Sequence, residues 1–296
     1  MDLKGFKPIA EGGGVKLYAP VESRFAFFNS PYPAHYWGTG IDIYLEEPFA
    51  GLAPSPVEGE VVEVRRVKAP SGSGFKASSH DAVILVRNAS NPETVTKILH
   101  VEPSVEPGEA VEVGDCLGVT LRSGYFGRWT SPHLHLEVRP VSSPLRVRGG
   151  VGLKRCLGIV GSPVSKVEGR VVEVCSEYAW LDPGVEAIGL VGEHGGEPLV
   201  FDGGIPYYKY FGVHGELSSG GFVELMGRRV AEVVDSYTNF HKARWVGPRL
   251  AANGYPLLGI SLTLTPSMRP LFKLIPPGEG GLPLKFGDWV ELSFED

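Results

Sequence analysis

The strongest constraint on the fold is a long succession of short, strand-prone segments separated by turn signals. β-Branched and aromatic residues favour strands, whereas clusters of glycine, proline and serine end them. The chain holds 40 Gly and 25 Pro, and such clusters stand at 71–74 and 123–127. No amphipathic helical pattern precedes residue 150, so the sequence predicts an all-β protein. Representative strand-prone segments are residues 59–67, 81–87, 133–139, 168–175 and 288–294.

A segment without periodicity, VSSPLRVRGGVG at 141–152, predicts a domain boundary. The 296 residues are enough for two ordinary domains. We therefore expect one domain at 1–147 and a second, β-rich domain of unassigned role at 148–296. Within the second domain, RRVAEVVDSY at 228–237 fits either a helix or a strand.

Charge and hydropathy exclude several classes of partner. The net charge is −6, with 15 Lys+Arg against 17 Asp+Glu in residues 1–150 and 13 against 17 in residues 151–296. Neither half has the basic excess of a nucleic-acid-binding protein. No apolar run approaches 18 residues, and the N-terminus lacks the apolar core of a signal peptide. We therefore expect no nucleic-acid partner, no membrane span and a cytoplasmic location.

Two residue types bear on redox state and source. Cys116, Cys156 and Cys175 form no metal-binding or disulfide pattern, so we interpret them as buried apolar residues, with a Cys156–Cys175 bridge as the alternative. The chain has no Gln and only five Asn. Depletion of thermolabile amides is typical of thermophilic proteins.

The segment SPHLHLEV, residues 131–138, places His133, His135 and Glu137 at alternating positions. Alternate side chains of a strand point to the same face, so these three should face away from the leucines between them. Two imidazoles in this arrangement are close enough to share one zinc ion. The pair alone is a weak motif, and for Glu137 a solvated strand carboxylate is the favoured interpretation.

Other histidines extend this pattern into a candidate zinc site. A hydrolytic zinc ion commonly has three nitrogen or oxygen ligands and one open position. His35, Asp42 and His135 can supply that ligand set. His100 and His133 remain available to polarise a water molecule and to stabilise a developing oxyanion.

The order of these elements resembles the lysostaphin-like (LytM-type) zinc metalloendopeptidases over roughly residues 20–140. The resemblance implies a partly open antiparallel β-barrel or sandwich of the duplicated hybrid motif type. It also implies Zn²⁺ bound by His35, Asp42 and His135, with His100 and His133 as catalytic residues that do not bind the metal. The segments that carry it are HYWGTGID, APSPVEGEVVEV, ILHV and VEVGDCLGVTLRSGYFGRWTSPHLHLEV.

One departure from the family pattern concerns the first two ligands. Six residues, YWGTGI, separate His35 from Asp42, a longer gap than the family usually has. An extended chain of that length would span roughly 23–25 Å, so the segment must loop back. Gly38 and Gly40 permit such a loop. A displaced His35 would leave Asn29 or His80 as substitute ligands.

Three functions are compatible with this fold. The first is a zinc-dependent metallopeptidase that hydrolyses peptide bonds in small-residue or cell-wall-type peptides. The alternative is a non-catalytic, metal-retaining binding or regulatory module. A biotinyl, lipoyl or phosphocarrier barrel is the third, and Asp42 together with HLHLEV argues against it. The loop SGYFGRW at 123–129 either lines a peptide groove or packs as a lid.

Overall fold

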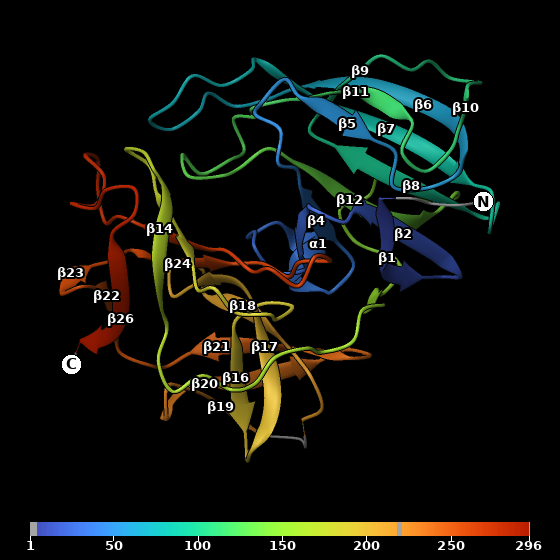
Figure 1. Ribbon diagram of the computed structural model, residues 1–296. Coiled ribbons are helices and arrows are strands. Elements are labelled where there is room, and N and C mark those ends of the chain that lie inside the picture. Colours follow the sequence, from blue (N-terminus) through green and yellow to red (C-terminus); the bar gives the residue numbers. More distant parts are fainter. Residues whose placement is uncertain (1–4, 218–220, 296) are drawn as a thin grey trace. The chain divides into compact units, whose positions relative to one another are not determined.

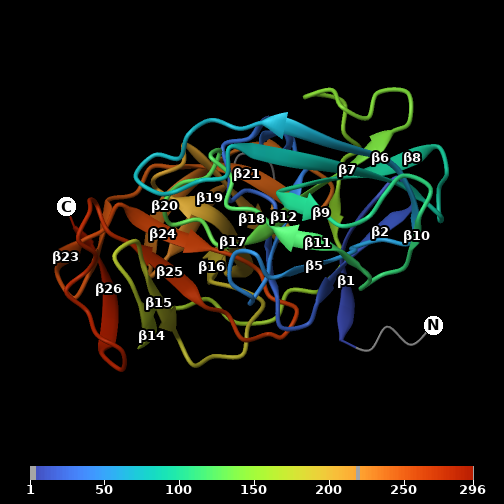
Figure 2. The ribbon, with the colours of Figure 1, turned by 90° about the horizontal axis from the view of Figure 1, so that it is seen from above.

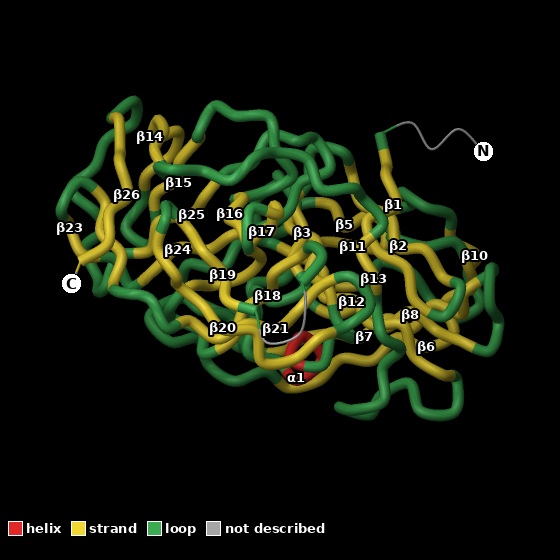
Figure 3. Tube along the Cα trace, turned by 90° about the horizontal axis from the view of Figure 1, so that it is seen from below, coloured by secondary structure: helices red, strands yellow, loops and turns green. Residues whose placement is uncertain are grey.

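The computed structural model describes residues 5–217 and 221–295, and strands dominate it. Within those residues α1 (Pro33–Tyr36) is the only helix, a single turn among strands (Figure 3). No helix in this part of the chain has the length and apolar character needed to cross a membrane. The all-β prediction is confirmed, and most of the ambiguous segment 228–237 forms a strand, β20 (Arg228–Ser236).

Contacts between residues divide the chain into two compact units. Unit 1 comprises Met1–Phe25 and Pro33–Leu157, and unit 2 comprises Ala26–Tyr32 and Gly158–Asp296. A short segment of the first half thus groups with the second half. The expected domains, 1–147 and 148–296, were meant as parts of the chain that fold independently. Their limits stay a prediction.

Unit 1 is built on an antiparallel sheet in the order β10-β6-β7-β8-β12-β4-β3. This sheet does not close on itself, as expected for a partly open barrel. Two smaller sheets, β5-β11-β9 and β13-β1-β2, complete the unit, and the first of them is seen in Figure 2. The strands are β1 (Phe6–Gly12), β2 (Val15–Pro20), β3 (Arg24–Ala26), β4 (Ile41–Tyr44), β5 (Leu52–Pro54), β6 (Gly59–Lys68), β7 (His80–Asn88), β8 (Thr94–Leu99), β9 (Val101–Pro103), β10 (Ala110–Val111), β11 (Cys116–Thr120), β12 (His133–Pro140) and β13 (Lys154–Arg155).

Strand β12 lies between β8 and β4 near the middle of this sheet (Figure 1). Its Leu134, Leu136 and Val138 are buried on one face, as the alternation predicts. His133 and His135 point to the other face, yet they are buried as well. The polar face of the sheet is therefore a largely enclosed site and not an open surface.

Unit 2 contains a closed barrel. The strands β16-β19-β20-β21-β18-β17 follow one another by hydrogen bonding, and β16 also pairs with β17, which closes the ring. The last residues of β17 leave the ring and pair with β24, which begins an open extension. Besides β20, the strands are β14 (Glu168–Val174), β15 (Ala179–Asp182), β16 (Val191–His194), β17 (Glu197–Ile205), β18 (Tyr210–His214), β19 (Phe222–Leu225), β21 (Phe240–Trp245), β22 (Arg249–Ala252), β23 (Tyr255–Pro256), β24 (Gly259–Leu262), β25 (Phe272–Ile275) and β26 (Trp289–Glu295).

The cysteines do not occupy the core. Cys116 and Cys156 are exposed and Cys175 is half-buried, and all three are free thiols. The prediction of buried apolar cysteines was therefore wrong for the first two, and the alternative Cys156–Cys175 bridge is not formed. Cys116 is the first residue of β11 and Cys156 directly follows the two-residue strand β13, so both lie at strand ends, outside the packed interior.

Candidate metal centre

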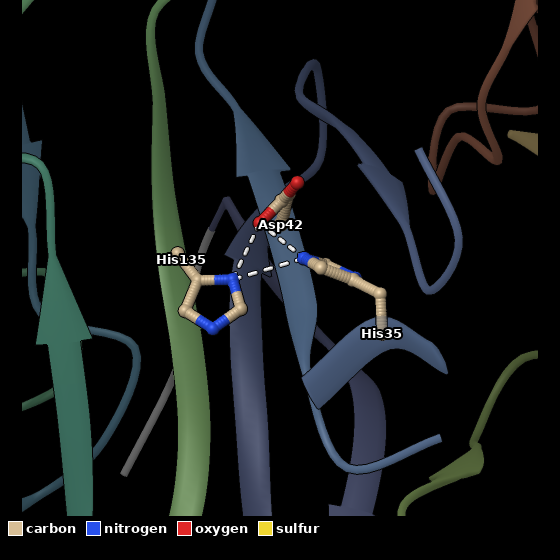
Figure 4. A group of neighbouring side chains, drawn as sticks. All are labelled: His35, Asp42 and His135. Atoms are coloured by element: carbon tan, nitrogen blue, oxygen red, sulfur yellow. Dashed lines mark hydrogen bonds and ion pairs between the residues drawn. The ribbon is translucent and has the colours of Figure 1, made fainter. Parts of the chain in front are cut away.

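Three side chains from three separate elements converge in unit 1. His35 comes from α1, Asp42 from β4 and His135 from β12, and Figure 4 shows them pointing toward one another. His35 Nε2 lies 3.0 Å from His135 Nδ1 and 3.2 Å from Asp42 Oδ1. His135 Nδ1 lies 2.9 Å from the same Asp42 oxygen. All three residues are buried.

The local chain path explains how His35 and Asp42 meet despite the six residues between them. α1 ends after Tyr36, and Gly38 then turns the chain with a φ of +64°. A Cβ on Gly40 would stand 2.9 Å from His135 Cε1, so only glycine fits this close approach. The chain loops back as the sequence requires, although the helical turn that carries His35 was not predicted.

The geometry fits a tetrahedral metal ion. Zinc bonds of about 2.0–2.1 Å place neighbouring tetrahedral ligand atoms about 3.3 Å apart. The three ligand atoms lie 2.9–3.2 Å apart, close to that separation. Two imidazoles and one carboxylate are also a ligand set that suits zinc. His35, Asp42 and His135 can therefore hold a metal ion with little rearrangement.

The neighbours of Asp42 keep its carboxylate ionised and oriented, as metal binding would require. Burial alone would raise its pKa, but the charges of His35 and His133 and hydrogen bonds from His135 and His35 hold the pKa well below its usual value. The Tyr44 hydroxyl donates a hydrogen bond of 3.2 Å to Oδ2. Oδ1 therefore remains directed at His35 and His135. Tyr44 was missed by the sequence analysis, although its position two residues along the strand from Asp42 puts it on the same face.

Glu137 lies behind His135 and is fully buried, which contradicts its interpretation as a solvated carboxylate. Its Oε1 is 2.7 Å from Lys97 Nζ, and its Oε2 accepts a hydrogen bond of 2.8 Å from Arg139. Arg139 in turn donates to the carbonyl oxygens of Ser143 and Arg148. The segment after β12 thus covers this part of the sheet and excludes water from it.

The same carboxylate influences His135. Oε1 of Glu137 lies 3.5 Å from His135 Nε2. Burial alone would lower the pKa of His135, but the hydrogen bonds and charges of Asp42 and Glu137 raise it to about 9. A carboxylate behind a ligand histidine fixes its tautomer and strengthens it as a ligand. Here the arrangement leaves Nδ1 to face the candidate metal position.

His100 and His133 lie beside this cluster. The centroids of their rings are 5.0 Å apart, and the His100 and His135 centroids are 6.3 Å apart. His133 Nδ1 donates to the Ser131 carbonyl oxygen, and burial lowers the pKa of His133 to about 4. The structure therefore brings together all five residues named from the sequence, while their individual roles stay predictions.

The 123–129 loop contributes a cover over these two histidines. The Phe126 ring centroid lies 4.7 Å from that of His100 and 4.6 Å from that of His133. Tyr125 is exposed. The sequence left two interpretations of this loop, a groove lining and a packed lid. The position of Phe126 fits the packed lid.

The two substitute ligands are engaged elsewhere. Asn29 Nδ2 donates to Ser261 Oγ within unit 2. His80 Nε2 lies 2.5 Å from Glu102 Oε2. Neither belongs to the group of His35, Asp42 and His135.

Fold and site define an all-β protein with a buried His-Asp-His candidate metal centre. Two family models match the chain: the N-terminal domain of the domain of unknown function DUF8155 at residues 16–155, and its C-terminal domain at residues 163–295. Both domains of one family thus span most of the chain, and the chain belongs to the DUF8155 family. No curated protein matches the chain.

Among the solved structures that are similar to part of the chain is the crystal structure of a zinc containing peptidase from Vibrio cholerae, 23% identical over 50% of this chain and 47% of that chain, with a TM-score of 0.26. The chain therefore spans less than half the length of that protein. A TM-score this low does not define a shared fold, so the geometry of the site carries the interpretation.

Proposed function

We propose that this protein is a zinc-dependent hydrolase of peptide bonds. The observation that carries the proposal is the convergence of His35 Nε2, Asp42 Oδ1 and His135 Nδ1 at separations of 2.9–3.2 Å. Three such ligands leave a fourth position open for water or substrate. Two further imidazoles, those of His100 and His133, lie beside the ligands, where proton transfer would be needed.

The chemistry divides between the metal and the side chains. A bound zinc ion would polarise the substrate carbonyl and make a nucleophile of water at neutral pH. His133 holds its Nδ1 proton against the Ser131 carbonyl oxygen, so its Nε2 is the atom left to exchange protons. That Nε2 lies 3.9 Å from Asp42 Oδ2, next to the ligand cluster. His133 and His100 are thus the proposed acid, base and oxyanion-stabilising groups.

The proposed substrate is a peptide with small residues at the cleaved bond, or a cell-wall-type peptide. The support is the resemblance of residues 20–140 to the lysostaphin-like endopeptidases, in which the same motifs occur in the same order. The enclosed site is consistent with this choice, because the Phe126 ring packs directly against His100 and His133, which would favour a substrate with small side chains.

Purified full-length protein should cleave a pentaglycine-type peptide when it holds zinc, and chelation should abolish the cleavage. A bound zinc ion would activate the water nucleophile and polarise the carbonyl, and no side chain of the site would replace it in these roles. Cleavage is followed by mass spectrometry, and zinc added back to the chelated protein should restore it, whereas Mg²⁺ should not. Cleavage that persists unchanged after complete metal removal would refute the proposal.

Zinc affinity should rise with pH up to about 9. The metal-free protein holds a proton on His135 below the raised pKa of about 9, and zinc needs that nitrogen unprotonated. Binding therefore releases about one proton, and the apparent affinity should increase about tenfold per pH unit below that pKa and level off above it. Calorimetry in buffers of different ionisation enthalpy counts the protons. Affinity independent of pH from 6 to 9 would contradict this account.

A second candidate function is a non-catalytic module that retains the metal. The observation that favours it is the position of Phe126 against both non-ligand histidines. A site closed in this way would hold zinc without admitting a peptide. Phe126→Ala distinguishes the two functions: if the loop only shapes the cleft, wild-type protein is already active, and if the loop blocks it, only the variant cleaves peptide.

A further inference from the structure

A buried carboxylate holds His100 through two separate bonds. Asp81 lies at the start of β7, and its Oδ2 is 2.6 Å from His100 Nδ1. Its Oδ1 accepts a hydrogen bond of 3.0 Å from the backbone amide of His100 and one of 2.7 Å from that of Ala82. Ser123 supplies a further hydrogen bond. Asp81 was not noticed in the sequence, where it is a single acidic residue at the edge of a strand.

Asp81 is a charged residue in an enclosed place. Its side chain is 1% exposed, whereas that of His100 is 12% exposed. Burial alone would raise the pKa of Asp81, but the charge and hydrogen bond of His100 lower it to about 2. The carboxylate is therefore ionised, and the only part of the pair that reaches solvent is the imidazole.

The backbone of His100 is also constrained. It has a φ of +72°, in the left-handed region that non-glycine residues rarely adopt. This conformation turns the chain between β8 and β9, and the Asp81 carboxylate bonds both the amide and the ring of the same residue. Because Asp81 bonds both the backbone amide and the ring of this strained residue, the His100 ring has a defined position.

We propose that Asp81 is a positioning residue that fixes His100 in the tautomer with the proton on Nδ1, so that Nε2 presents its lone pair to the metal centre. The inference rests on the proposed function and adds to it a residue outside the ligand set and the two histidines. In the hydrolytic step, a proton from the attacking water moves to Nε2 as the water oxygen bonds the carbonyl carbon. Asp81 then balances the charge of the imidazolium.

The variant Asp81→Asn tests this with little change in shape. Two backbone amides donate to the Oδ1 position, so the amide oxygen of asparagine must take that place. The amide nitrogen must then occupy the Oδ2 position and face His100 Nδ1. A donor there forces Nδ1 to act as an acceptor, which moves the proton to Nε2. The Ser123 hydroxyl can donate or accept, so it does not oppose this orientation.

The readout is the protonation of each ring nitrogen, measured by long-range ¹H–¹⁵N correlation on full-length ¹⁵N-labelled protein at mildly alkaline pH. The His100 signals are assigned by their loss in His100→Gln. Wild-type protein should show a protonated Nδ1 and an unprotonated Nε2, and Asp81→Asn should show the reverse. Glu102→Gln is the matched control, because it breaks the partly exposed His80 pair and should leave the His100 signals unchanged.

Wild-type protein with its His100 proton on Nε2 would overturn the proposal, and this test needs no variant to fold. An unchanged tautomer in a folded Asp81→Asn would also overturn it. Asp81→Asn should keep full zinc content and, where wild type cleaves peptide, lower kcat by about 10²–10⁴-fold. The tautomer is measured without substrate, so it can be determined whether or not the protein cleaves peptide. A protein that cleaves nothing would refute the proposed hydrolase but would not change the result for the Asp81–His100 pair.

Discussion

His135→Ala should lose zinc and peptide cleavage together, whereas His133→Ala should keep zinc and lose rate. His135 is proposed to supply one of three ligand atoms, and its Nδ1 lies 2.9 Å from Asp42 Oδ1 and 3.0 Å from His35 Nε2. Without it two protein ligands remain, too few for a stable site. His133 is the neighbouring imidazole, and its loss should slow cleavage by about 10²–10⁴-fold, as expected for a positioned proton-transfer group.

Zinc stoichiometry by atomic spectroscopy and cleavage rate are measured side by side on both variants. His80→Ala is the matched control, because His80 pairs with Glu102 and should affect neither quantity by more than a few-fold. Full zinc in His135→Ala would contradict the ligand set. Equal zinc loss in both variants would mean that His133 supports the metal as well.

Glu137→Gln should lower the free energy of unfolding by about 3–5 kcal/mol. Glu137 is fully buried and forms ion pairs with Lys97 and Arg139, which are buried too. Removing one charge of a buried network leaves the others without compensation, which is far more damaging than the loss of an exposed ion pair. The variant should also weaken zinc binding by about 10–100-fold, because Glu137 supports His135 from behind.

Chemical denaturation and zinc competition measure these two effects. Glu102→Gln is again the control, since the partly exposed ion pairs of Glu102 with Arg66 and His80 should each contribute no more than about 1 kcal/mol. Lys97→Met should be less destabilising in the Glu137→Gln background than in wild type, because it removes a cation that has lost its partner. A Glu137→Gln protein as stable as wild type would show that the network is solvated, contrary to its burial.

The sequence by itself determined the fold class and named the five candidate site residues that the structure brings together. Strand periodicity and turn residues define an all-β chain because side-chain alternation and the turn preferences of Gly and Pro are local properties. His35, Asp42, His100, His133 and His135 could be named because their residue types suit a zinc site and because the order of their segments resembles that of the lysostaphin-like endopeptidases. The need for a loop between His35 and Asp42 also followed from chain length alone.

Only the tertiary structure decided how those residues are supported. Glu137 is a buried charge because the segment after β12 folds back over Arg139, which no pattern near Glu137 indicates. Phe126 and Asp81 join the site from a loop and from a separate strand, and each is inconspicuous in its own stretch of sequence. The exposed cysteines show the same limit, since their type suggested burial and their positions at strand ends prevented it. Burial and pairing depend on which distant segments cover a face, and that information is not local.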